Sequence, residues 1–307
     1  MQLTADALGI SAGAVADAVF SDPRRGHPVA LFGTTVAAIE KTTYADSRLR
    51  GALFAAAGIG IGVCAGIVAR KAGAAGTAAA TFTALGGTSL AAIGDDIADA
   101  LDAGDIAGAR ALVAGLVGRD TTLLDEAGIC RAAVESIAEN TSDATVAPLF
   151  WGAVAGAPGL LGYRAANTLD AMVGYRSPRY QRFGWASARI DDVANIVPAR
   201  LTAVLVGVLS GAPGPVWRAV RRDAAAHPSP NAGVVEAAFA GALGITLGGR
   251  TVYAHGTELR PTLGDGRPPL AADLRAATRL SRRVQRASAV AASLAVARGQ
   301  FRSDGVV

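Results

Sequence analysis

The sequence predicts an all-α polytopic integral membrane protein, a helical bundle whose connecting segments are polar and partly helical. Hydrophobic residues make up 51% of the chain and charged residues only 18%, and the mean hydropathy is +0.35. Several apolar runs approach the roughly 20 residues that cross a hydrocarbon core. Ala, Gly and Val supply much of this apolar content, and small residues let membrane helices pack closely. An Ala-rich soluble helical bundle is the alternative.

The first half of the chain contains three apolar stretches. The N-terminal one carries Asp6 and Asp17 and lacks a basic n-region, so we expect no cleavable signal peptide. Residues 51–69 and 72–94 contain no charged residue and are separated by a basic pair. They predict two spans joined by a tight turn.

The second half predicts further membrane segments. Residues 144–163 form a third candidate span, in which Pro148 and Pro158 predict a kink or break. Residues 201–217 form a fourth. Two later apolar runs are too short to span alone, which leaves about four to six spans by the length rule. We expect a single domain, 1–307, in the cell membrane, with a polar loop at residues 253–269. We expect no binding of nucleic acid, because the arginines are not interleaved with aromatic residues.

Basic residues predict the orientation. The positive-inside rule places arginine-rich segments on the cytoplasmic side of the membrane. We therefore expect the cytoplasmic segments to include Arg218, Arg221 and Arg222 and the arginine-rich segment 275–286. No Walker A motif is present, so a soluble nucleotide-binding domain is not expected.

Two clusters of acidic and amide residues stand beside the apolar segment 144–163. In ESIAENTSD, Glu135 and Glu139 lie four residues apart, and a helix would place Ser136, Asn140 and Asp143 on an adjoining stripe. Carboxylates and an amide would therefore share one broad face.

The second cluster, RIDDVAN, aligns Asp191 and Asp192 with Asn195. Oxygen ligands at helical spacing suit Mg²⁺, which combines a few carboxylates with waters and substrate phosphates. The two clusters could clamp one metal–phosphate group. The alternative is that these acids face water or pair with nearby arginines such as Arg189 and Arg200.

Other polar residues occur in apolar surroundings and are candidate binding or catalytic groups. Arginines suit phosphate because the guanidinium fork matches its oxygens, and histidines at the starts of apolar segments are candidate bases. These residues are Asp22 and His27 in DPRRGHPV, Arg164, Asn167 and Asp170 in YRAANTLDAM, and His227 and Asn231 in HPSPNAG.

Several unusual strings occur in one order and carry a family resemblance. They are DPRRGHPV, VGRDT, ESIAENTSD, APLFWGAVAGAPG, NTLDAMVGY, FGWASARIDDVANIVPAR, HPSPNAG and EAAFAGALG. The chain resembles the CobD/CbiB family of adenosylcobinamide-phosphate synthases, integral membrane proteins of cobalamin biosynthesis. It departs from the family pattern at Gly26, at Ala144 with Thr145, and at Ala171, none of which removes an ionisable group.

The resemblance implies an amide-forming ligase that joins adenosylcobyric acid to aminopropanol or its phosphate. Activation of the carboxylate would need ATP and Mg²⁺. The resemblance also implies corrinoid and aminopropanol (phosphate) substrates, a lipid bilayer as surroundings and a site open to the cytoplasm. The C-terminal arginine-rich segment could contact another cobalamin-pathway enzyme.

On this hypothesis each candidate has a role. Mg²⁺ ligands would be Glu139, Asn140, Asp143, Asp191, Asp192 and Asn195. Catalytic groups would be His27, His227, Glu135, Arg189 and Arg200, with a histidine accepting the proton of the attacking ammonium and the arginines holding phosphate. Substrate-binding groups would be Asp22, Arg164, Asn167, Asp170 and Asn231.

Two other functions fit parts of the sequence. A membrane prenyltransferase would also bind Mg²⁺-diphosphate through aspartate-rich motifs, but the first cluster does not repeat the DDxxN pattern. A transporter would place its acids at midspan, whereas most of these acids lie near span ends.

Overall fold

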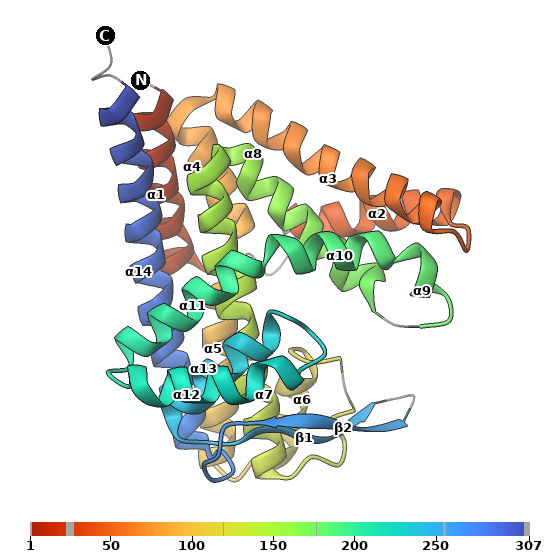
Figure 1. Ribbon diagram of the computed structural model, residues 1–307, viewed down its shortest axis with the longest axis vertical. Helices are drawn as coiled ribbons and strands as arrows, with labels where there is room; N and C mark the ends of the chain where they lie inside the picture. Colours follow the sequence, from red (N-terminus) through yellow and green to blue (C-terminus); the bar gives the residue numbers. More distant parts are fainter. Residues whose placement is uncertain (1, 23–27, 119, 176, 254–255, 304–307) are drawn as a thin grey trace. The chain divides into compact units, whose positions relative to one another are not determined.

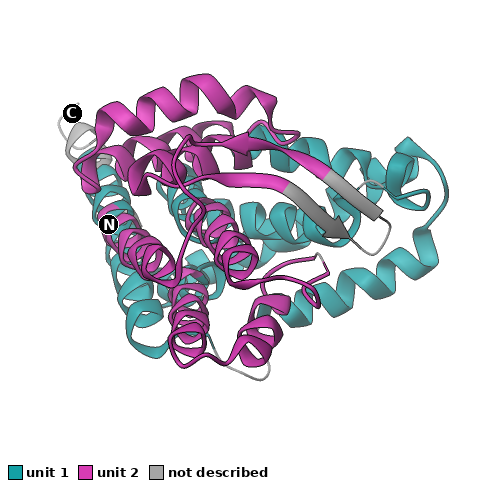
Figure 2. Ribbon diagram, turned by 90° about the horizontal axis from the view of Figure 1, so that it is seen from below, with its two compact units in different colours: residues 1–86, 143–195, 288–307 teal, residues 87–142, 196–287 magenta. Residues whose placement is uncertain are grey.

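The computed structural model describes residues 2–22, 28–118, 120–175, 177–253 and 256–303. These residues are mostly helical (Figure 1) and divide into two compact units, which Figure 2 colours separately. Unit 1 comprises Met1–Gly86, Asp143–Asn195 and Ser288–Val307, and unit 2 comprises Gly87–Ser142 and Ile196–Ala287. Each unit is therefore assembled from segments that are far apart in the sequence.

Unit 1 is helical throughout its described part. Its elements are α1 (Gln2–Phe20), α2 (Pro28–Thr43), α3 (Arg48–Lys71), α4 (Gly73–Ala84), the π-helical turn η1 (Ser142–Val146), which begins one residue before the unit, α8 (Ala147–Leu169), the π-helical turn η2 (Asp170–Gly174), α9 (Tyr180–Phe183), α10 (Trp185–Ala194) and the C-terminal part of α14 (Ala271–Ser303).

A glycine stripe on α3 explains how this helix packs against α8. A Cβ at Gly58 would lie 2.8 Å from a methyl carbon of Leu169, and one at Gly62 would lie 2.5 Å from the Leu161 carbonyl oxygen. Gly66 meets the α8 backbone at Ala157 in the same way. The two helices run side by side in Figure 1, and only glycine permits so close an approach.

Two apolar clusters fill unit 1. In one, Ile10 of α1, Leu149 and Leu160 of α8, and Val296 of α14 are buried together. The Ser11 hydroxyl of α1 also donates to the Ser293 hydroxyl of α14 at 2.8 Å. The second cluster joins residues of four helices with one of η2, namely Val36, Phe54, Leu169, Val173 and Phe183.

The predicted kink in the apolar segment 144–163 is present. Gly156 has a φ of 66° and a ψ of −153°, which a residue with a side chain rarely adopts. It precedes Pro158, whose ring cannot continue the regular hydrogen bonding of the helix.

Unit 2 combines helices with one hairpin. Its elements are α5 (Gly87–Asp102), α6 (Ile106–Ala114), α7 (Glu126–Thr141), α11 (Ile196–Leu209), α12 (Pro213–Asp223), the 3₁₀ turn η3 (Ala224–Ala226), α13 (Ala232–Leu243), β1 (Leu247–Tyr253), β2 (Gly256–Leu263) and the first part of α14.

The described residues are otherwise mostly helical, in agreement with the all-α prediction, but the antiparallel pair β1 and β2 replaces part of the polar loop expected at residues 253–269. Gly249 pairs with Arg260, and the register shifts between Leu247 and Gly249. Gly248 and Gly249 there have positive φ values of 76° and 82°. Glycine tolerates this conformation, so the bulge forms where the sequence reads Leu-Gly-Gly.

The arginine-rich segment predicted to be cytoplasmic begins α14 and is partly engaged within unit 2. Arg275 pairs with Asp102 of α5, and Arg282 lies 2.7 Å from Asp95 of the same helix. These arginines therefore join two helices.

The structure revises the predicted spans. Among the described residues, Arg48–Lys71 and Glu126–Gly174 are long and apolar enough to cross a membrane, and Trp185–Ala194 with Ile196–Leu209 would add a third if the bent pair acts as one span. The first two include the predicted runs 51–69 and 144–163. Run 72–94 is instead divided between α4 and α5, and run 201–217 is broken between α11 and α12, so both single-span predictions were wrong.

Candidate functional site

Polar side chains converge within unit 1 on Asn167 of α8. The Asn167 amide nitrogen donates to Asp143 Oδ2 at 3.4 Å and to Asp191 Oδ1 at 3.2 Å. Asn195 donates to Asp191 Oδ2 at 3.0 Å, and the Tyr163 hydroxyl donates to Asn195 Oδ1 at 2.9 Å. We call these five residues the unit 1 cluster.

Helical spacing explains how the unit 1 cluster forms. Tyr163 and Asn167 are four residues apart, as are Asp191 and Asn195, so each pair lies on one face of its helix. The Trp151 indole N–H donates to the Ala194 carbonyl oxygen at 3.1 Å and ties α8 to the end of α10. The cluster is therefore centred on Asp191, which accepts hydrogen bonds from Asn167 and Asn195. Tyr163 donates in turn to Asn195.

Arg164 and Asp22 lie beside this cluster. The Arg164 Nε is buried and makes no hydrogen bond among the described residues, and the charges of Asp22 and Asp143 act on the guanidinium. A Cβ on Gly86 would lie 3.4 Å from Asp22 Oδ2 and 3.9 Å from Arg164 Nη2. A cation therefore stands next to the carboxylates, where it could bind an anionic oxygen.

Mg²⁺ fits the donors of the unit 1 cluster. No group of three or more His, Cys, Asp or Glu residues in the described part of the chain is placed to hold a metal ion. Mg²⁺, however, is commonly bound through one or two carboxylates, with waters and substrate phosphates completing its shell. Asp143 and Asp191 supply two carboxylates that share one amide donor.

The other predicted residues of unit 1 are less enclosed. Asp192 accepts a hydrogen bond from Arg189 at 3.2 Å, and the Arg189 side chain is 63% exposed. Asp170 is half-buried in η2. His27 lies outside the described residues. Both π-helical turns, η1 and η2, carry a predicted acid, and such turns are frequent at functional sites.

Unit 2 contains a separate polar cavity of about 410 Å³, which we call the unit 2 pocket. Its lining groups come from the segment between α6 and α7, from α7, from the segment before α13, from α13 itself and from β2. The residues are Leu116, Val117, Gly118, Glu135, Ser136, Glu139, Asn140, His227, Pro228, Ser229, Glu236 and Arg260.

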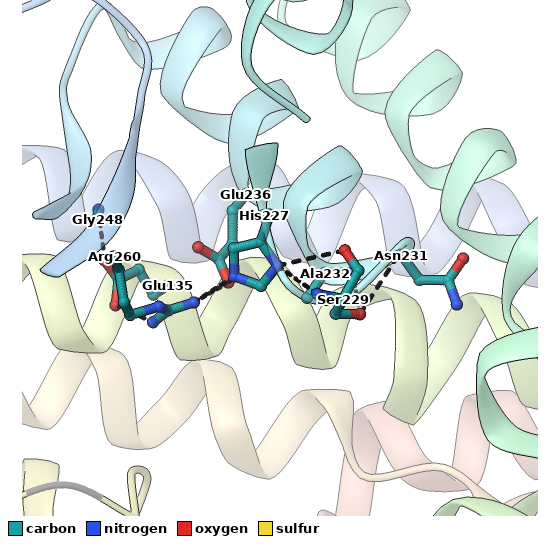
Figure 3. Close-up of polar contacts among 8 residues, drawn as sticks. All are labelled: Glu135, His227, Ser229, Asn231, Ala232, Glu236, Gly248 and Arg260. Carbon is teal, nitrogen blue, oxygen red and sulfur yellow. Dashed lines mark hydrogen bonds and ion pairs between the residues drawn. The ribbon is translucent and has the colours of Figure 1, made fainter. Parts of the chain in front are cut away.

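Arg260 of β2 joins three of these side chains (Figure 3). Its Nη1 donates to Glu135 Oε2 at 3.3 Å, and its Nη2 donates to Glu236 Oε1 at 3.2 Å and to His227 Nε2 at 2.5 Å. Glu135 Oε1 accepts the Gly248 N–H at 2.8 Å, so the bulge of β1 also anchors this carboxylate. The hairpin therefore supplies both a cation and a backbone donor to the pocket.

His227 is held as a neutral imidazole. A guanidinium can only donate, so His227 Nε2 accepts from Arg260, and Nδ1 lies 3.3 Å from the Ser229 carbonyl oxygen and 3.1 Å from the Ser229 backbone nitrogen. Burial and the charge of Arg260 lower the pKa of His227. Both ring nitrogens are consequently engaged within the protein.

Glu236 is the most enclosed acid of the unit 2 pocket. Its side chain is 1% exposed, and its Oε2 is buried with no hydrogen-bond partner among the described residues. Burial, and next the negative charge of Glu135, raise the pKa of Glu236 to about 8 despite the opposing effect of Arg260.

The structure brings some predicted residues together and separates others. Glu135, Glu139, Asn140 and His227 line the unit 2 pocket, whereas Asp143, from the same acidic motif, belongs to the unit 1 cluster. Arg200 donates to Asn231 Oδ1 at 2.7 Å in unit 2. The assignments of these residues to metal, phosphate or catalysis stay predictions.

The sequence did not single out Arg260, because it lies in the expected polar loop, where no periodicity identifies it. Glu236 is a candidate from the sequence, because it is the one acid of an otherwise apolar segment, AGVVEAAFAGAL.

The structure defines a mostly helical protein with apolar helices long enough to cross a membrane, a polar cluster in unit 1 and a polar pocket in unit 2. The family model described as "CobD/Cbib protein" matches residues 10–281, and the chain belongs to this CobD/CbiB family.

Relatives named "Cobalamin biosynthesis protein CobD" cover most of the chain. The one from Mycobacterium tuberculosis is 56% identical over 95% of this chain and 96% of its own length. Those from Rhodobacter capsulatus and Geobacter metallireducens are 45% and 44% identical, over 85% and 83% of this chain and 86% and 85% of their own lengths. No solved structure matches the chain.

Proposed function

We propose that this protein acts in cobalamin biosynthesis as an enzyme that joins the carboxylate of adenosylcobyric acid to aminopropanol or aminopropanol phosphate through an amide bond. Membership of the CobD/CbiB family and the names of its relatives support the pathway. The observation that carries the reaction type is the convergence of Asp143 and Asp191 on Asn167, beside the buried Arg164.

A carboxylate does not react with an amine at neutral pH until it is activated. We propose that ATP supplies the activation, by forming an acyl phosphate on the corrinoid carboxylate. Mg²⁺ bound by Asp143 and Asp191 would neutralise charge on the phosphoryl group.

The chain's own residues would position this chemistry. Asn167 and Asn195 hold Asp191 through both of its carboxylate oxygens, and Arg164 offers a cation to a phosphate oxygen. When the amine attacks, a nitrogen–carbon bond forms, the carbon–oxygen bond to phosphate breaks, and the nitrogen gives up a proton.

We propose that the protein lies in the cell membrane, which the length and apolar composition of its helices support. The positive-inside rule, applied to the arginine-rich segments, and the cytoplasmic location of ATP favour a site that opens to the cytoplasm.

The full chain purified in detergent tests this function. Incubated with adenosylcobyric acid, ATP, Mg²⁺ and either aminopropanol or its phosphate, it should yield a corrinoid whose mass equals the sum of the two substrates less one water. Omission of Mg²⁺ or of ATP should abolish the product.

Two variants and two outcomes complete the test. Asp143→Asn and Asp191→Asn should each lower product formation by about 100-fold, a magnitude typical of displaced catalytic groups. Failure to couple either amine, or turnover of an isoprenoid diphosphate instead, would overturn the proposal.

A further inference from the structure

We infer that the unit 2 pocket binds the primary ammonium group of a small amine, and that Glu236 is the carboxylate that receives this ammonium and takes its proton. The identity of the amine as the substrate of amide formation rests on the proposed function. The binding itself follows from the charges and the unfilled hydrogen-bonding capacity of the pocket.

The charges of the unit 2 pocket favour a cation. Arg260 is matched by Glu135, which it contacts at 3.3 Å, and His227 is neutral because its Nε2 accepts from Arg260. Glu236 adds a further carboxyl group to the pocket lining. An ammonium bound beside Glu236 would favour the ionised carboxylate and pair with it.

Glu236 has an oxygen available for that ammonium. Its Oε1 accepts from Arg260, while Oε2 is buried without a partner. A buried carboxylate oxygen left without a donor costs free energy, and an ammonium supplies three donors. Asn140 lines the same pocket, and its amide nitrogen donates to the Ser136 carbonyl oxygen at 2.9 Å.

His227 is less suited to accept the proton. Its Nε2 lone pair is occupied by Arg260, and its Nδ1 lies within hydrogen-bonding distance of the Ser229 backbone. The imidazole would first have to break the contact with a permanent cation. Glu236 can take a proton on Oε2 with its other contacts intact.

The proton balance is defined. The charged and titratable groups facing Glu236 are Glu135 and Glu139 of α7, Arg260 of β2 and His227. Because the pKa of Glu236 is about 8, the carboxyl is mostly protonated in the free pocket at pH 7. An arriving ammonium favours the carboxylate, so binding expels one proton to solvent. The carboxylate then takes one proton from the ammonium, which frees the nitrogen lone pair. The neutral amine can attack, and the nitrogen gives up its second proton to solvent as the amide forms.

The size of the pocket agrees with a small ligand. A cavity of about 410 Å³ lies at the low end of ligand pockets, which run from roughly 300 to 1,000 Å³. A corrinoid is far larger than an aminoalcohol, and only the latter would be enclosed.

Isothermal titration calorimetry of the full chain in detergent tests the inference without corrinoid or ATP. The probe is 1-aminopropan-2-ol, and the matched neutral probe is propane-1,2-diol, in which a hydroxyl replaces the ammonium. We expect the amine to bind at least tenfold more tightly than the diol at pH 7. Heats measured in buffers of different ionisation enthalpy should show release of close to one proton.

Glu236→Gln should weaken amine binding at least tenfold and abolish the proton release. Glu126→Gln, the same substitution at an exposed position in the first turn of α7, should leave both unchanged. Helical circular dichroism and the unfolding temperature establish that each variant is folded.

Three outcomes would overturn the inference. They are equal binding of amine and diol, unchanged proton release in Glu236→Gln, and Glu236-dependent binding of inorganic phosphate in place of the amine. If the amine binds as expected but no corrinoid product forms under any condition, the proposed function fails and the amine site stands.

Discussion

Glu236 Oε1 and His227 Nε2 lie 3.7 Å apart, and the Arg260 guanidinium contacts both side chains. The pKa values of these two side chains are shifted in opposite directions. Burial keeps the carboxyl protonated and raises its pKa, while burial and the neighbouring cation keep the imidazole neutral and lower its pKa. Neighbouring groups whose pKa values are moved in this way are typical of acid–base sites.

Glu236 should make stability depend on pH. An unfolded glutamate ionises near 4.5, whereas the pKa of Glu236 in the fold is about 8. The folded protein therefore holds more protons between these values, and stability falls as pH rises from 4.5 to 8. Glu236→Gln removes this loss of stability. The unfolding temperature of the variant, relative to that of the wild type, should therefore rise between pH 5.5 and pH 8.5. A constant difference over that range would contradict the assignment.

Arg260 should be important for the stability of unit 2. Arg260→Met removes a cation that contacts Glu135, which is 2% exposed, and breaking such a buried pair costs about 3 kcal/mol or more. The double variant Arg260→Met with Glu135→Gln should lose less stability than the sum of the losses of the two single variants. Arg275→Met serves as control, because the exposed pairs of Arg275 should contribute about 1 kcal/mol or less. Denaturation in detergent measures these differences.

Asn167 should be required for activity because it holds two carboxylates at once. Asn167→Ala removes both donors, and we expect product formation to fall about 100-fold as Asp143 and Asp191 lose their relative placement. The Mg²⁺ concentration for half-maximal rate should also change. The neighbouring Thr168 hydroxyl donates to the Arg164 carbonyl oxygen of its own helix, so Thr168→Val should keep most of the activity. Equal effects of both changes would argue against the unit 1 cluster.

The two adjacent aspartates of the DDxxN motif should differ. Asp191 accepts from two amides, whereas Asp192 pairs with the exposed Arg189. Asp191→Asn should therefore lower the rate about 100-fold, and Asp192→Asn by only a few-fold, as expected for a solvent-exposed ion pair. Product formation at saturating Mg²⁺ compares them, and a larger loss for Asp192→Asn would reverse their roles.

Gly51 should tolerate no side chain. A Cβ there would lie within 1.8 Å of the Phe183 carbonyl oxygen, whereas a Cβ on Gly60 of the same helix meets nothing within 4 Å. Gly51→Ala should cost about 1–3 kcal/mol because the backbone must move. Gly60→Ala should change stability by no more than about 0.5 kcal/mol. Thermal unfolding of the two variants decides whether this close contact exists.

Local sequence patterns predicted the features that depend on a single helix. The charge-free run 51–69 gave α3, and the four-residue spacing of Asp191 and Asn195 put both on one face of α10. Run 72–94 was misread because hydropathy does not register the break at Leu85–Gly86, where the Gly86 N–H bonds to the Ala144 carbonyl oxygen instead of continuing a helix. The hairpin was missed because its strands, LGGRTVY and GTELRPTL, contain glycines and a proline and show no regular alternation of apolar and polar residues.

The sequence by itself determined the helical, apolar character of the chain, its acidic motifs and, through the order of those motifs, the family. These properties are encoded in neighbouring residues. Only the tertiary structure decided that Glu135 and Asp143 serve different units, and that Arg260 reaches Glu135 across 125 residues of sequence. Such contacts depend on how whole elements pack, and no local periodicity records which distant side chain will meet a buried charge.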